Sequence, residues 1–298
     1  MKNLFFILLF YSLFSSNFLD ANTNLYSKKK ESPINNTILI SIDGISRNTL
    51  YALIAKNKLP NLAKIITRGN YRNIEVNSEE CSMVSSYTKL LTGSNNNDVF
   101  LTNEPNNKVV AFGKTIFEKI KNSKPELNVG VVFNSSSNYH EQIRFSQLFS
   151  EIPTESITVY PEENRDCKKT ALLVNGFIED NQEPFFIFVN FTDVEQIGHR
   201  YREGAELYSE AIRKCDTAIG EIIDRLEQEK AWESTHFYIT TNYGFLPKSR
   251  KYKTANKIWL VSTKKVLRKG FLTDLMHSIL ANYGIYHDNI DHTDLFKN

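Results

Sequence analysis

Short, almost wholly apolar segments alternate with helical patterns along most of this 298-residue chain, and this alternation constrains its fold. Four of these segments have the length of single strands: residues 38–42, 129–133, 185–191 and 237–240. Strands that are apolar on both faces are typical of a parallel sheet covered by helices on both sides. We therefore predict a three-layer α/β/α sandwich with a mostly parallel central sheet, its strands joined by right-handed crossovers.

Further elements follow from local patterns. Two more strands are expected at residues 71–76 and 256–262. Apolar residues recur with the 3.6-residue helical period in the segments between strands, most clearly in residues 207–230. The predicted helices cover residues 47–57, 60–69, 85–93, 113–126, 166–180, 207–230 and 271–285. No internal repeat and no second core interrupt the pattern, so one domain is expected.

The first residues have a different character. Lys2 precedes a short apolar stretch, and small polar residues follow it. This pattern is typical of a secretory signal peptide, and the apolar stretch is short for a transmembrane helix. We predict a signal peptide over residues 1–24, a linker over 25–36 and a single α/β domain over 37–298. The protein is then secreted or periplasmic, and it meets a membrane only if the signal segment stays uncleaved.

Composition limits the partners and the covalent chemistry. The net charge is only +2, which gives no reason to expect a nucleic-acid partner. The three cysteines, Cys81, Cys167 and Cys215, do not make a disulfide-dense scaffold. One bridge would leave one thiol over. Cys215 falls on the apolar stripe of its predicted helix, which favours a core position over a bridge.

Polar side chains follow three of the predicted strands where each strand ends. In an open α/β sheet, ligands bind at the carboxyl ends of the strands. Carboxylate and imidazole groups are ligands of divalent zinc or manganese. Hydrolases of phosphate esters often use two such metals. The polar residues at these strand ends are Asp43 after the first strand, Asp193, Glu195 and His199 after the third, and Asn242 and Tyr243 after the fourth.

Four segments give the chain a resemblance to the alkaline phosphatase superfamily, especially its type I phosphodiesterase and sulfatase-like branches. "ILISIDGISRNTL" resembles the opening strand, whose Asp is a metal ligand in the family. "ECSMVSSYTKLLTG" resembles the helix that carries the nucleophile. "PFFIFVNFTDVEQIGHRY" resembles the segment written Asp-x-Asp-x-x-Gly-His, and "STHFYITTNYGF" the strand that ends in Asp-His-Gly. The resemblance runs from about residue 37 to 286 and implies the same α/β fold.

The resemblance implies a metal site with several ligands replaced. Asp43 and His199 match family ligands, and Glu195 stands where the family has Asp. Asn242 stands in place of an Asp and Tyr243 in place of a His, and a neutral tyrosine is a poor zinc ligand. The segment after residue 245 lacks the family's last histidine. The resemblance then implies either one divalent metal, zinc or manganese, held by Asp43, Glu195 and His199, or no metal at all.

The nucleophile is also altered. The family's Thr or Ser position falls on Met83, with Ser82 one residue away and Cys81 as the alternative. The Cys/Ser-x-Pro-x-Arg signature of formylglycine sulfatases is absent. Lys248, Arg250 and Lys251 follow the fourth strand and would serve to neutralise a phosphoryl group in place of a missing metal.

These observations leave two hypotheses. The first is a secreted pseudoenzyme of the superfamily with a binding or scaffold role, whose partner is a protein or a glycan. The second is an active metal-dependent phosphoric ester hydrolase acting on small mono- or diesters, with the metal on Asp43, Glu195 and His199 and with Ser82 attacking. The second requires Ser82 Oγ to face Asp43.

Ordinary structural roles compete with both hypotheses. His199 can be a turn or surface histidine, Asp43 a cap between strand and helix, and Glu195 a solvated acid. A protein that shares only the fold would have all three in such roles.

Overall fold

The computed structural model describes residues 36–77, 82–101, 108–135, 149–150, 158–163, 166–181, 184–245, 255–286 and 292–297. The chain divides into two units, residues 1–34 and 35–298, and the described part belongs to the second. The predicted signal peptide lies outside the described residues, as do Cys81, Lys248, Arg250 and Lys251.

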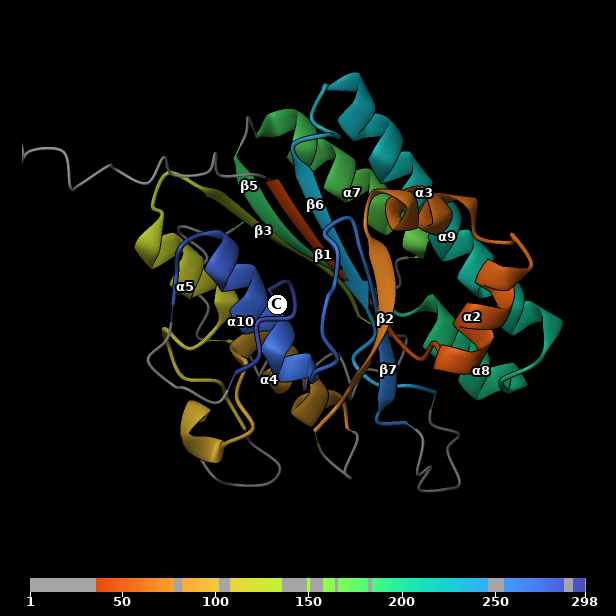
Figure 1. Ribbon diagram of the computed structural model, residues 1–298, viewed down its shortest axis with the longest axis horizontal. Coiled ribbons are helices and arrows are strands. Elements are labelled where there is room, and N and C mark those ends of the chain that lie inside the picture. Colours follow the sequence, from red (N-terminus) through yellow and green to blue (C-terminus); the bar gives the residue numbers. More distant parts are fainter. Residues whose placement is uncertain are drawn as a thin grey trace, which may run out of the picture. The chain divides into compact units, whose positions relative to one another are not determined.

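A seven-stranded sheet forms the middle layer, with the strand order β2-β7-β6-β1-β5-β3-β4 (Figure 1). The strands are β1 (Asn36–Ile42), β2 (Asn70–Glu75), β3 (Asn128–Ser135), β4 (Thr158–Glu163), β5 (Phe185–Phe191), β6 (Thr235–Thr240) and β7 (Lys257–Ser262). β7 pairs antiparallel with both β6 and β2, and the other pairings are parallel. The predicted mostly parallel sheet is confirmed.

Helices cover both faces of the sheet (Figure 1). On one face lie α2 (Arg47–Ala55), α3 (Pro60–Arg68), α7 (Cys167–Asp180), α8 (Asp193–Tyr201) and α9 (Glu206–Gln228). On the other lie α4 (Met83–Thr92), α5 (Ile116–Ser123) and α10 (Leu272–Asn282), and a short 3-10 turn covers Asn97–Val99. The three-layer α/β/α sandwich is therefore confirmed.

The central strands have buried side chains on both faces of the sheet, because successive side chains alternate between the two faces. Ile38 and Ile40 are fully buried in the core beneath α7 and α9. On the opposite face, Phe117 of α5 packs against Phe186 and Phe188 of β5, with ring centroids 6.1 and 6.0 Å apart. The continuous apolar runs in the sequence thus reflect burial on both sides.

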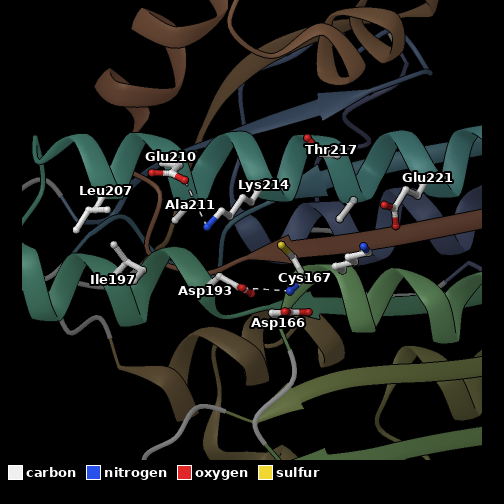
Figure 2. Close-up of a pocket in the computed structure, with 12 residues that line it drawn as sticks. Asp166, Cys167, Asp193, Ile197, Leu207, Glu210, Ala211, Lys214, Thr217 and Glu221 are labelled. Atoms are coloured by element: carbon white, nitrogen blue, oxygen red, sulfur yellow. Dashed lines mark hydrogen bonds and ion pairs between the residues drawn. The ribbon is translucent and has the colours of Figure 1, made fainter.

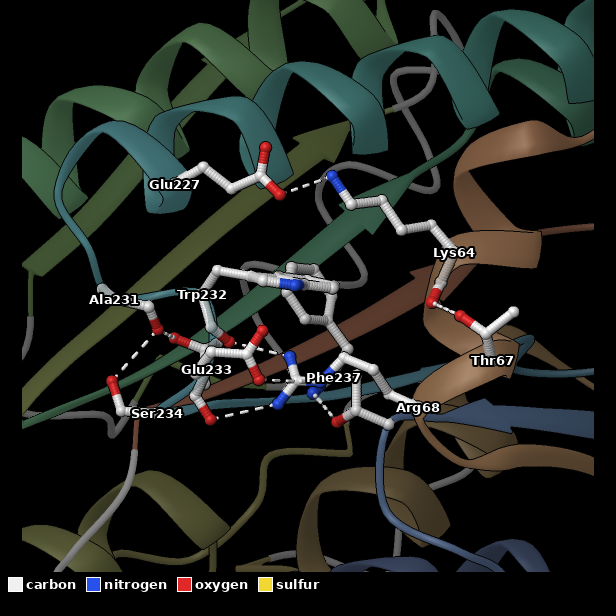
Figure 3. A network of polar contacts seen from close by, with 11 residues as sticks. Lys64, Thr67, Arg68, Glu227, Ala231, Trp232, Glu233, Ser234 and Phe237 are labelled. Atoms are coloured by element: carbon white, nitrogen blue, oxygen red, sulfur yellow. Dashed lines mark hydrogen bonds and ion pairs between the residues drawn. The ribbon is translucent and has the colours of Figure 1, made fainter.

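The end of α3 is attached to the turn after α9 by one arginine (Figure 3). The Arg68 guanidinium lies 4.4 Å from the centroid of the Trp232 ring. It donates hydrogen bonds to the carbonyl oxygens of Trp232 at 2.7 Å and Glu233 at 3.1 Å. Lys64, one turn earlier, forms an exposed ion pair with Glu227 at 2.5 Å. These contacts connect two helices of the same layer.

Two elements are missing from the sequence prediction. α8 begins at Asp193, directly after β5, where the sequence analysis expects only polar residues beyond a strand end. β4 is a sheet-edge strand that contains Pro161, and a proline is tolerated there because one side of an edge strand has no partner. Among the described residues, no helix combines the length and the apolar character needed to cross a membrane.

Candidate functional site

The candidate site lies where three neighbouring parallel strands end. β1 lies between β5 and β6, so the segments that follow these three strands meet at one edge of the sheet. The Asp43 backbone N–H donates to the Phe191 carbonyl at 2.8 Å, which places the end of β1 beside the end of β5. The sheet therefore brings together three strand-end segments that lie far apart in the sequence.

Asp43 is buried, with 3% of its surface exposed, and its carboxylate is surrounded by donors. The Tyr87 hydroxyl of α4 lies 2.7 Å from Oδ1 and 2.6 Å from Oδ2. Ser41 Oγ donates to Oδ1 at 2.9 Å, and Asn190 Nδ2 donates to Oδ2 at 2.9 Å. Asn190 Nδ2 also donates to the Tyr87 hydroxyl. Three protein groups thus donate to the two carboxylate oxygens, and the Tyr87 hydroxyl lies within reach of both.

The pKa of Asp43 is raised from its usual value to about 8, first by burial and then by the nearby charge of Glu195. The hydrogen bonds from Tyr87, Ser41 and Asn190 act in the opposite direction and are smaller in effect. The pKa of the Tyr87 hydroxyl is raised well above its usual value, first by burial and then by the charge of Asp43. Little water solvates either group, and this favours the protonated forms of both Asp43 and Tyr87.

Gly44 allows α8 to approach the end of β1. Its φ is +76°, in the left-handed region that favours glycine. A Cβ at this position would lie 2.8 Å from both Cα and Cβ of Glu195. Position 44 therefore requires glycine, because any side chain there would collide with Glu195.

Glu195 lies in the first turn of α8 and is 9% exposed. The Tyr243 hydroxyl donates to Glu195 Oε1 at 2.6 Å, and His199 Nε2 lies 3.6 Å from the same oxygen. The His199 ring packs against Phe245, with centroids 5.6 Å apart. The residue at the replaced histidine position, Tyr243, therefore contacts Glu195 by a hydrogen bond.

Two other predicted residues are placed differently. Ser82 is the N-cap of α4, and its hydroxyl accepts from the Ser85 N–H at 3.2 Å. The α4 hydroxyl that contacts Asp43 belongs to Tyr87 instead. Asn242 is fully buried, and its Oδ1 accepts from the Tyr243 N–H at 2.8 Å. Sequence reasoning missed Tyr87 and Asn190. The single polar residue in the apolar run 185–191 is the one signal that points to Asn190.

These residues do not fit a divalent metal in the arrangement that the structure shows. Both oxygens of Asp43 already accept hydrogen bonds, and Glu195 Oε1 accepts one from Tyr243. Within the described part of the chain, Asp43, Glu195 and His199 do not bring one ligand atom each within 4.8 Å of one another.

Solved structures with the same fold belong to the alkaline phosphatase superfamily and its sulfatase-like relatives. A protein of that superfamily from Vibrio parahaemolyticus aligns with a TM-score of 0.60 and 14% identity, covering 90% of this chain and 71% of the other. The phosphonate monoester hydrolase of Agrobacterium radiobacter aligns at 0.60 and 13%, covering 84% and 74%. Ps i-CgsB in complex with k-i-k-neocarrahexaose aligns at 0.64 and 13%, covering 88% and 75%. No curated protein matches the sequence.

The chain has the fold of an alkaline phosphatase superfamily protein, in agreement with the resemblance drawn from the sequence. Residues 101–294 match the family described as Type I phosphodiesterase / nucleotide pyrophosphatase, and the chain belongs to that family. The match includes Glu195, His199, Asn242 and Tyr243, whereas Asp43 and Ser82 precede it.

Proposed function

We propose that this chain is a secreted pseudoenzyme of the type I phosphodiesterase family, with a binding or scaffold role in place of metal-dependent hydrolysis. The observation that carries the proposal is the pairing of Asp43 with Tyr87. Both carboxyl oxygens of Asp43 are already engaged by Tyr87, Ser41 and Asn190. A metal would have to displace these donors.

The second strand-end carboxylate supports the same proposal. Tyr243 replaces a ligand and at the same time supplies a hydrogen bond to Glu195. Without the Tyr243 hydroxyl, Glu195 would keep the longer contact with His199 at 3.6 Å, and a buried carboxylate with fewer hydrogen bonds is costly. The tyrosine thus offsets the loss of the metal, as expected of a site that is retained for its shape.

The proposed ligand is a small phosphate ester or a glycan that binds at the strand ends. Two proteins with this fold support the choice of ligand. One is named a phosphonate monoester hydrolase, and the other, Ps i-CgsB, was solved in complex with k-i-k-neocarrahexaose. Secretion is inferred from the N-terminal pattern of Lys2 and the apolar stretch after it.

Hydrolysis assays on the purified chain test the proposal. The substrates are bis-p-nitrophenyl phosphate and p-nitrophenyl phosphate, each with added zinc or manganese. We expect no turnover above the protein-free blank. Turnover that His199→Ala abolishes and His292→Ala leaves intact would overturn the proposal, because His292 lies outside the strand-end site and controls for general damage.

The alternative function would then apply: a metal-dependent phosphoric ester hydrolase with the metal on Asp43, Glu195 and His199. Ser82→Ala would test its nucleophile. Tyr87→Phe would distinguish the two functions further, because removal of the Asp43 donor should raise turnover if a metal competes for that carboxylate. Under the pseudoenzyme proposal, Tyr87→Phe stays inactive.

A further inference from the structure

A second group of side chains of the types that bind metals lies among α7, α8 and α9. Cys167, Asp193 and Cys215 come from α7, α8 and α9, and one ligand atom of each lies within 4.8 Å of the others. Both thiols are free and both cysteines are buried. Three consecutive helices thus direct two sulfurs and one carboxylate to a common point.

The local backbone favours negative charge at this point. Cys167 and Asp193 are the first residues of α7 and α8, where the free N–H groups and the helix dipole stabilise anions. The Cys167 N–H donates to Asp193 Oδ1 at 3.1 Å, which orients the carboxylate. Asp193 Oδ2 is buried and has no hydrogen-bond partner among the described residues. A buried carboxylate oxygen with no donor is costly unless a cation satisfies it.

A cavity adjoins the cluster. It has a volume of about 460 Å³, and Cys167 and Asp193 are part of its lining. Figure 2 shows the start of α7 at Cys167 and the start of α8 at Asp193 facing each other below α9. Lys168 and Lys214 also line the cavity and would offset part of the negative charge. A small ligand or a water molecule in the cavity can therefore approach the side of the cluster that Cys167 and Asp193 form.

We propose that Cys167, Asp193 and Cys215 form a binding site for a thiophilic divalent cation, zinc above all, with its fourth position open to the adjoining cavity. Two thiolates and a carboxylate are a ligand set that suits zinc better than magnesium or calcium. Ligand atoms about 2.0–2.3 Å from a tetrahedral zinc lie about 3.3–3.8 Å from one another. The observed upper limit of 4.8 Å requires only a small closure of the three side chains.

This site is separate from the strand-end site. Asp193 and Glu195 are two residues apart on α8, so their side chains leave the helix in nearly opposite directions. Asp193 contacts the start of α7, whereas Glu195 contacts Tyr243. The inference therefore goes beyond the proposed function, and it holds whether or not the strand ends retain a metal.

Titration of the reduced, EDTA-treated full chain with Co²⁺ tests the site, because thiolate ligation gives a near-ultraviolet charge-transfer band that carboxylate and imidazole ligands do not. We expect one Co²⁺ per chain with this band, displaced by Zn²⁺. Cys167→Ala and Cys215→Ala should abolish the band. Asp193→Asn keeps both thiols and should weaken binding about 10-fold or more.

Three matched variants should keep the band. Cys81→Ala removes the third thiol, Asp166→Asn changes a cavity residue outside the cluster, and Asp43→Asn changes the strand-end site. Circular dichroism confirms that each variant is folded. The proposal is overturned if the wild-type chain gives no charge-transfer band at stoichiometric Co²⁺. It is also overturned if the band survives Cys215→Ala, or if the cysteines form a disulfide whose reduction yields no Co²⁺ binding.

Discussion

The Tyr87 hydroxyl lies 2.7 and 2.6 Å from the two carboxylate oxygens of Asp43, and this pairing connects α4 to the end of β1. Tyr87→Phe removes the donor and leaves Asp43 buried with fewer hydrogen bonds. We expect the free energy of unfolding to fall by about 1–3 kcal/mol, the usual cost of an unsatisfied buried polar group. Urea denaturation followed by circular dichroism measures the change.

Tyr51→Phe is the matched control. The Tyr51 hydroxyl also donates a short hydrogen bond, to Asn73 Oδ1 at 2.6 Å, but at an exposed position. Its loss should change stability by less than about 0.5 kcal/mol. Equal effects of the two substitutions would mean that the Asp43 pairing contributes nothing beyond a surface contact.

Asp43 should make stability depend on pH in an unusual direction. Its pKa is raised from 3.8 to about 8, so the folded state holds a proton that the unfolded state releases. The stabilisation by Asp43 is complete below the unfolded pKa and is lost as pH rises toward about 8.

Asp43→Asn cannot titrate and should lack this dependence. We expect wild-type stability minus Asp43→Asn stability to decrease steadily between about pH 5 and pH 7. Urea denaturation of both proteins across this range measures the difference. A difference that stays constant over this range would contradict the prediction, because it would show that Asp43 is already ionised in the folded protein, as a metal ligand would be.

The fold was predictable from the sequence because burial on both faces leaves continuous apolar runs. The same runs do not encode strand direction, and the antiparallel pairing of β7 was therefore not predicted. α8 was missed because its short sequence, DVEQIGHRY, resembles a strand-end motif and has few apolar residues to mark a helical period.

The candidate site was predictable only in part. Asp43, Glu195 and Tyr243 follow neighbouring strands, so their proximity depends on sheet order alone. Tyr87 comes from α4, and its contact with Asp43 depends on where that helix crosses the opposite face of the sheet. Nothing in the local pattern around Tyr87 specifies that position. The contact of Tyr87 with Asp43 could therefore be found only from the structure.

Gly44→Ala should disturb the contact between β1 and α8. The substitution places a side chain at φ +76° and brings Cβ to 2.8 Å from the Glu195 backbone. We expect a loss of about 2–4 kcal/mol from backbone strain and crowding together. Gly113→Ala isolates the first effect, because its φ is +77° and no atom lies within 4 Å of the added Cβ. A loss no larger than that of Gly113→Ala in thermal or urea unfolding would contradict the crowding at Glu195.

Arg68→Lys should weaken the attachment of α3 to α9 although it keeps the charge. The guanidinium stacks on Trp232 and donates to two carbonyl oxygens, which a lysine ammonium cannot do in the same plane (Figure 3). We expect a loss of about 1–2 kcal/mol in the free energy of unfolding.

Lys64→Ala is the control on the same helix, α3. It removes the exposed ion pair with Glu227 of α9 and should cost less than about 1 kcal/mol. The two variants are compared by urea denaturation at low and high salt. Only the Lys64 effect should shrink with salt, because Arg68 stacks on a neutral ring and donates to neutral carbonyl oxygens. No loss on Arg68→Lys would show that Arg68 contributes through its charge alone.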